Sequence, residues 1–109
     1  MEGGKEKQEW TACPAPHGPY AYALRVVGDA MSAPHGPSYP PGCIIIVDPD
    51  QTPVPGDRIL AALDGEPDAA FKILVRDGGK TFLKSLNPHY PPIFEEFRIL
   101  GKVIGAWIE

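Results

Sequence analysis

The sequence lacks the features of nucleic-acid-binding and membrane-spanning proteins. Its 109 residues include 10 Lys and Arg against 14 Asp and Glu, a formal net charge of −4, with no basic cluster and no helix-turn-helix pattern. This balance excludes a basic footprint for nucleic acid on the chain itself. No apolar run reaches the roughly 18 residues that a membrane span needs. We therefore expect a cytoplasmic protein without a membrane partner.

Cysteine is also scarce, because Cys13 and Cys43 are the only two. Their spacing fits neither a zinc site nor the dense pattern of a secreted disulfide scaffold, so both are expected to be reduced and structural. His17, His35 and His89 lie in proline-flanked stretches without a paired acid or thiol, which argues against a metal or catalytic role. We expect no metal and no cofactor.

Glycine and proline are abundant, with 12 and 14 residues, and the hydrophobic content is 43%. Compact apolar runs separated by such residues favour a folded, loop-rich β domain over disorder. No segment keeps the apolar 3.6-residue period of a helix over ten residues. The sequence thus predicts a mostly β fold, a single small domain of twisted antiparallel strands and hairpins.

The chain divides into an arm and a domain. Residues 1–19 are charged and then proline-rich, so we expect an extended N-terminal arm with little structure of its own, followed by the domain over residues 20–109. Asp77-Gly78 predicts a hairpin. Alternating or β-branched patterns predict these strands: from near Tyr20 to Gly28, Cys43–Val47, Arg58–Leu63, Ala69–Arg76, Thr81–Leu86 and Arg98–Ile108.

A lone lysine, Lys72, stands inside an apolar strand with small and apolar neighbours on its own face. Burial there would remove hydration from the ammonium and lower its pKa from about 10.4, so that the neutral amine acts as a base. The alternative is a side chain that lies along the apolar face and keeps its charge in water. Lys84 and Lys102 also lie in predicted strands and compete for the role.

The turn after the first strand, Gly28-Asp29-Ala30-Met31, looks like a serine-protease nucleophile turn with alanine in place of serine. Further motifs follow it in order: Pro41-Gly42, Ile44-Ile45-Ile46-Val47-Asp48, Pro55-Gly56-Asp57, Phe71-Lys72, Leu86-Asn87-Pro88 and Gly101-Lys102-Val103-Ile104. As an ordered set over about residues 20–108, they resemble the C-terminal domain of the LexA and lambda-type phage repressor family. They are more distantly similar to the mutagenesis protein UmuD.

The resemblance implies a self-cleaving serine/lysine peptidase. It places the nucleophile at Ala30, the general base at Lys72, and the oxyanion hole at the backbone N–H groups of Asp29 and Ala30. Because alanine has no hydroxyl, self-cleavage is expected to be absent. Ser32 would be displaced from the nucleophile's position. Either a deliberate serine-to-alanine substitution or a natural loss of cleavage explains Ala30.

The resemblance also implies a biological setting, the regulatory and dimerisation domain of a phage-type transcriptional repressor. The partners would be a second copy of the chain, as a homodimer or higher homo-oligomer, and a RecA filament that promotes cleavage in the SOS response. DNA would be bound only by a domain upstream. Trp107, in a strand taken to be an edge, is the candidate for the dimer interface.

In this family the cut falls at an Ala-Gly or Cys-Gly bond upstream. Neither dipeptide occurs in the sequence, so the chain resembles the downstream product. Two alternatives stay open. One is a UmuD-like accessory subunit of a translesion DNA polymerase. The other is an active processing peptidase related to signal peptidases, against which the missing hydroxyl at position 30 counts.

Overall fold

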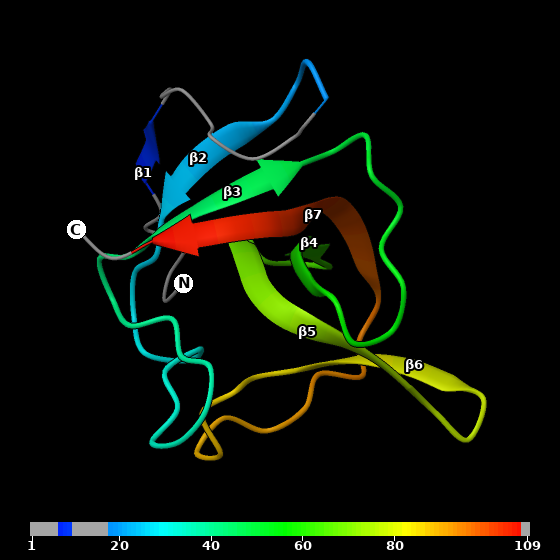
Figure 1. Cartoon of the computed structure of the whole chain (residues 1–109). Coiled ribbons are helices and arrows are strands. Elements are labelled where there is room, and N and C mark those ends of the chain that lie inside the picture. The colour runs from blue at the N-terminus through cyan, green and yellow to red at the C-terminus, as the bar shows by residue number, and fades with distance from the viewer. Residues whose placement is uncertain (1–6, 10–17, 108–109) are drawn as a thin grey trace.

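The computed structural model describes residues 7–9 and 18–107, which form one seven-stranded antiparallel sheet (Figure 1). Its strands are β1 (Lys7–Glu9), β2 (Tyr22–Arg25), β3 (Ile44–Asp48), β4 (Arg58–Leu63), β5 (Ala69–Asp77), β6 (Lys80–Lys84) and β7 (Phe97–Trp107). They are ordered β1-β2-β3-β7-β4-β5-β6. Within this part of the chain no helix is long and apolar enough to cross a membrane. The prediction of a small, mostly β domain is confirmed.

β3 explains why the sheet has two apolar faces. All five of its residues are buried, as its β-branched run predicts for a strand covered on both sides. Ile45 and Val47 belong to the largest apolar cluster, which also contains Met31 and Phe71. The alternate residue Ile46 belongs to a second cluster with Trp107 packed against it. β3 therefore anchors both faces of the sheet.

β7 is the longest strand and lies between β3 and β4. Its pairing shifts register twice, between Ile46 and Val47 of β3 and between Leu60 and Ala61 of β4. Such bulges bend a strand and increase its twist. Figure 1 shows the result as a strongly curved β7 that follows the curvature of the sheet.

The predicted hairpin lies between β5 and β6. Asp77 pairs with Lys80, and the two-residue loop Gly78-Gly79 has positive φ at both positions, 60° and 81°. Two consecutive positive φ angles match the twist that a tight hairpin requires. The predicted strand bounds agree to within a few residues, except that β2 ends at Arg25 rather than near Gly28 and β6 ends at Lys84 rather than Leu86.

One expectation about the edges of the sheet was wrong. β7 is not an edge strand, since β3 and β4 flank it. Residues 7–9 of the predicted arm form the short strand β1, which pairs with β2. The local alternation of residues identifies a strand but not its neighbours, so the place of β7 was not visible in the pattern.

Candidate functional site

The turn that carries Ala30 is held by a backbone hydrogen bond and by packing of Met31 in the core. Gly28 has a φ of 85°, which lets the chain turn sharply after β2. The Ser32 N–H donates to the Asp29 carbonyl at 3.0 Å, so Ala30 and Met31 are the central residues of a β-turn. Met31 is buried in the largest apolar cluster, and Ala30 is only 5% exposed. The backbone of this turn is therefore held in place by core packing.

Lys72 is buried on β5, with 8% of its surface exposed. Its Nζ donates a hydrogen bond to Ser85 Oγ at 2.6 Å, and Ser85 itself is 3% exposed. Burial lowers the pKa of Lys72, because the ammonium loses hydration. The expected direction of the shift is confirmed, and the alternative of an ammonium in open solvent is excluded.

The segment 85–90 connects Lys72 with the Ala30 turn. The Asn87 N–H donates to the Ala30 carbonyl at 2.9 Å, and Asn87 Nδ2 donates to the Asp29 carbonyl at 3.1 Å. Tyr90 contacts both the Ala30 turn and Lys72. Its hydroxyl donates to Asp29 Oδ1 at 2.6 Å, and Lys72 Nζ lies 5.4 Å from the centroid of its ring. Two parts of the chain that are remote in sequence are thus joined by one short segment.

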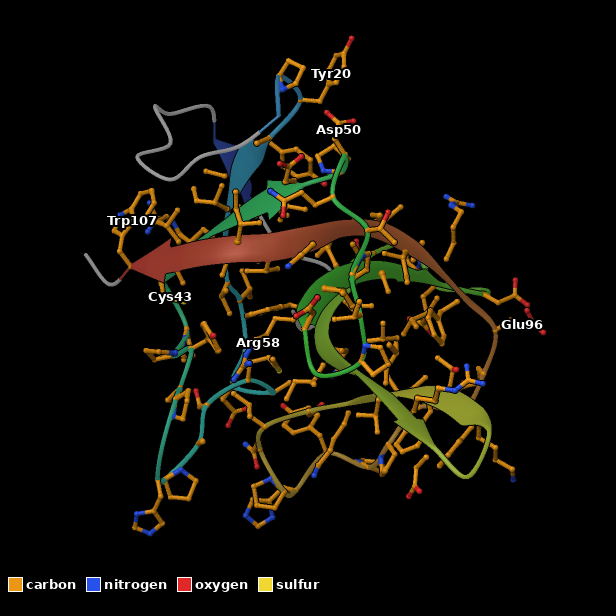
Figure 2. The ribbon with its side chains drawn as sticks, turned by 45° about the vertical axis from the view of Figure 1, so that its right-hand side comes forward. Tyr20, Cys43, Asp50, Arg58, Glu96 and Trp107 are labelled. Carbon is orange, nitrogen blue, oxygen red and sulfur yellow. The ribbon has the colours of Figure 1, made fainter. Side chains whose placement is uncertain are left out.

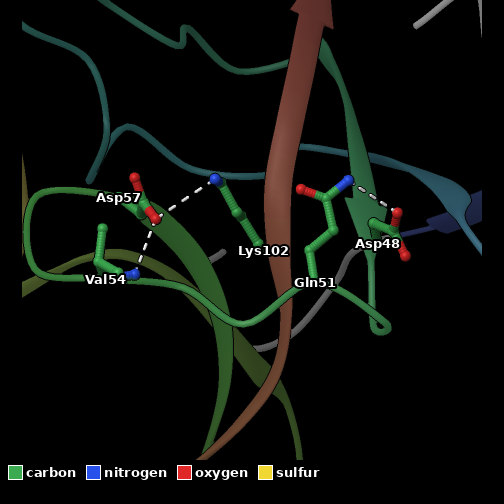
Figure 3. Close-up of polar contacts among 5 residues, drawn as sticks. All are labelled: Asp48, Gln51, Val54, Asp57 and Lys102. Atoms are coloured by element: carbon green, nitrogen blue, oxygen red, sulfur yellow. Dashed lines mark hydrogen bonds and ion pairs between the residues drawn. The ribbon is translucent and has the colours of Figure 1, made fainter. Parts of the chain in front are cut away.

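The competing lysines have other environments. Lys102 Nζ lies 3.5 Å from Asp57 Oδ2 in a part-exposed ion pair (Figure 3), and the same carboxylate oxygen accepts the Val54 N–H at 2.8 Å. Lys84 is exposed on β6. Of the three lysines weighed in the sequence, Lys72 is the buried one.

Several backbone and hydroxyl groups around the turn have no hydrogen-bond partner among the described residues. Within residues 7–9 and 18–107, neither Asp29 N–H nor Ala30 N–H has a hydrogen-bond acceptor. The Ser32 hydroxyl is buried and also has no partner within these residues. The hydroxyl bound to the Lys72 amine is that of Ser85, not that of Ser32.

Asp48, the last residue of β3, stabilises the turn that follows this strand. Asp48 is fully buried and accepts from Gly18 N–H at 2.8 Å and from Asp50 N–H at 3.0 Å. It also accepts from Gln51 Nε2 at 3.0 Å, a bond that Figure 3 shows. These bonds satisfy a carboxylate that would otherwise be costly to bury. They fix the turn at the end of β3.

The remaining predicted residues have simple environments. His35 and His89 are exposed, whereas Cys13 and His17 lie outside the described residues. Cys43 is a free, buried thiol, and burial raises its pKa. In the part of the chain that the structure describes, no three His, Cys, Asp or Glu side chains are grouped to hold a metal ion.

Trp107 ends β7 and lies near Cys43 (Figure 2). It packs against the cluster formed by Ala23, Ile44 and Ile46, and it lines an open groove with Pro37, Tyr39 and Ala106. Because β3 and β4 flank β7, Trp107 does not belong to an edge strand. Its place at a dimer interface stays a prediction.

Neither Ser85 nor Tyr90 was predicted to contact Lys72. The signal for Ser85 was present in the hairpin. Counting from the loop Gly78-Gly79, the pairing Ile73↔Lys84 is followed by Lys72 opposite Ser85. For Tyr90 no local signal exists, because its partners Asp29 and Lys72 belong to other segments.

A family model described as Peptidase S24-like matches residues 2–104 of the chain. The chain belongs to the Peptidase S24-like family. The match includes the Ala30 turn, Lys72 and the segment 85–90 that joins them.

Relatives of this Peptidase S24-like chain include repressor proteins from a phage and from bacteria. It is 48% identical over 88 residues to Repressor protein C2 of Salmonella phage P22, covering 79% of this chain and 41% of the relative. It is 40% identical over 108 residues to an HTH-type transcriptional regulator for conjugative element SXT of Vibrio cholerae, covering 96% and 50%. It is 34% identical over 88 residues to a LexA repressor of Verrucomicrobium spinosum, covering 79% and 41%. The chain spans half or less of the length of these relatives.

Proposed function

We propose that this chain is the regulatory and dimerisation domain of a phage-type transcriptional repressor, with a self-cleavage site that lacks its nucleophile. Ala30 occupies the position of the nucleophilic serine and Lys72 is the general base. The observation that carries the proposal is that Tyr90 and Asn87 bind the Ala30 turn while Ser85 and Tyr90 contact the Lys72 amine.

The chemistry follows from the environment of Lys72. A neutral amine in a dehydrated site takes the proton of a serine hydroxyl as that hydroxyl attacks a carbonyl carbon. The N–H groups of Asp29 and Ala30, which have no acceptor within the described residues, are suited to bind the oxygen that becomes negative. With a methyl group at position 30 no attack occurs, so the domain stays uncut.

The repressor setting draws its support from the relatives. These relatives are named as repressors and an HTH-type transcriptional regulator, which favours a repressor over a UmuD-like polymerase accessory. A domain that pairs two DNA-binding regions makes the second DNA contact intramolecular and so raises affinity by avidity. In an intact repressor a RecA filament would promote cleavage and separate the DNA-binding region from this domain.

The test restores the nucleophile. Ala30→Ser is made in a chain extended upstream by the cleavage-site segment of the family, and the protein is incubated at raised pH and with activated RecA. We expect two fragments from Ala30→Ser, none from Ala30→Ser with Lys72→Ala, and normal fragments from Ala30→Ser with Lys84→Ala. An Ala30→Ser protein that stays intact under all these conditions would refute the proposed site.

A further inference from the structure

The hydroxyl that binds the Lys72 amine belongs to Ser85, the residue directly after β6. The paired register of β5 and β6 extends to Ile73↔Lys84, and one further step along both strands sets Ser85 opposite Lys72. Cross-strand neighbours on one face have Cβ atoms about 4.5–5.5 Å apart. The register of the β5–β6 hairpin therefore places the Ser85 hydroxyl next to Lys72.

The contact is short and dehydrated. The distance from Lys72 Nζ to Ser85 Oγ is 2.6 Å, with 8% and 3% of the two residues exposed. Within the residues that the structure describes, Ser85 Oγ is the one hydrogen-bond partner of the amine. A lysine side chain has many accessible rotamers, so a single buried hydrogen bond decides where its amine lies.

We propose that Ser85 is a positioning residue for Lys72, and that its hydroxyl holds the amine beside the turn that carries Ala30. The inference rests on the proposed function, because it assigns Lys72 as the base. Ser85 acts through the lysine rather than on a substrate, since its own burial keeps a peptide away from its oxygen. Both the ammonium and the neutral amine can donate to that oxygen, and the ammonium does so more strongly.

The surroundings of the amine leave few other groups to set its position or charge. From the segment 85–90 the Tyr90 ring lies over Nζ, with Asp29 bound to the far side of the Tyr90 hydroxyl. From β4 the apolar Ile59 is paired opposite Lys72. The nearest basic residue of β4, Arg58, places its guanidinium over the Tyr39 ring instead.

The first experiment uses the chain as it exists and needs no cleavage. The Cε and Hε signals of Lys72 are followed by NMR across a pH titration in the wild-type chain, in Ser85→Ala and in Ser85→Thr. We expect the pKa of Lys72 to fall further in Ser85→Ala, because an acceptor for the ammonium is lost, and to return toward the wild-type value in Ser85→Thr. Thr81→Ala removes an exposed hydroxyl from the same strand and is the matched control.

The second experiment measures cleavage in the upstream-extended Ala30→Ser protein. We expect Ser85→Ala to slow cleavage by about tenfold, as a small misplacement of a catalytic group does, and to move the pH–rate profile toward lower pH. Ser85→Thr should restore most of the rate. Circular dichroism and a melting curve for each variant separate loss of fold from loss of position.

The two experiments distinguish failure of the inference from failure of the proposed function. If Ala30→Ser is cleaved but Ser85→Ala changes neither the rate nor the Lys72 titration, Ser85 is not a positioning residue and the proposed function stands. If Ala30→Ser is never cleaved, the proposed function fails, and the titration alone decides whether Ser85 holds the amine. Covalent labelling of Ser85 by a serine-directed fluorophosphonate would overturn the inference by making Ser85 itself a nucleophile.

Discussion

At the scale of single residues, the buried amine of Lys72 makes stability depend on pH. Burial lowers the pKa of Lys72 in the folded protein. In the unfolded chain the same side chain has the ordinary lysine pKa of about 10.4. Between these two values the unfolded state binds more protons than the folded state. The free energy of unfolding therefore rises with pH through this window, and the cost of the buried ammonium is greatest below it.

This sign gives a prediction for Lys72→Met, which removes the charge and keeps an apolar stem. The variant should be more stable than the wild-type chain at about pH 6, and its advantage should shrink toward about pH 10. Urea unfolding at several pH values measures the difference, and Lys84→Met, at an exposed position, is the control. An advantage that does not change with pH would mean that the amine is not dehydrated.

Asp48 gives a second prediction at this scale. Its carboxylate is fully buried and accepts hydrogen bonds from Gly18 N–H, Asp50 N–H and Gln51 Nε2. Asp48→Asn removes the charge and turns one acceptor into a donor, so we expect a loss of about 2 kcal/mol of unfolding free energy. Thermal and urea unfolding test it against the exposed Asp50→Asn. A loss no larger than that of Asp50→Asn would contradict the assigned role.

At the scale of the elements, β7 joins the two parts of the sheet, β1-β2-β3 and β4-β5-β6. It lies between β3 and β4 and passes close to the backbone of β3 at Gly101. A Cβ at that position would lie 2.6 Å from Val47 Cγ1 and 3.2 Å from the Asp48 carbonyl oxygen. Both neighbours are fully buried, so neither can yield freely. The glycine is required by this close approach and not by its φ angle.

The same strand offers a matched pair of substitutions. Gly101→Ala should destabilise the fold by about 1–3 kcal/mol through overpacking. Gly105→Ala should be tolerated, because its new Cβ would meet only Ile46 Cγ1 at 4.0 Å. Chemical unfolding of both variants measures the difference. Equal stability of the two variants would show that β3 and β7 do not approach each other as described.

At the scale of the whole molecule, the proposed role requires self-association. We expect sedimentation equilibrium to give twice the chain mass of 11.8 kDa at micromolar concentrations, with dissociation on dilution. A matched measurement on Ala30→Ser should give the same association, because position 30 is buried in its own turn. A monomer mass throughout would remove dimerisation from the proposed function.

The sequence by itself determined the β class, six of the seven strands and the hairpin at Gly78-Gly79. These features depend on local alternation and on turn residues, which each segment carries alone. It also indicated the dehydration of Lys72, because the neighbours of that residue along its strand are small or apolar. For β1 no alternation was visible, since that strand exists through its pairing with β2.

Only the tertiary structure decided which segments meet. The central place of β7, and with it the failure of the edge-strand argument for Trp107, follows from pairings with β3 and β4 that no local pattern encodes. The contacts of Tyr90 with Asp29 and Lys72 likewise join three separate segments. Such contacts form only after the chain closes long loops, and the strand order then fixes which side chains share a site.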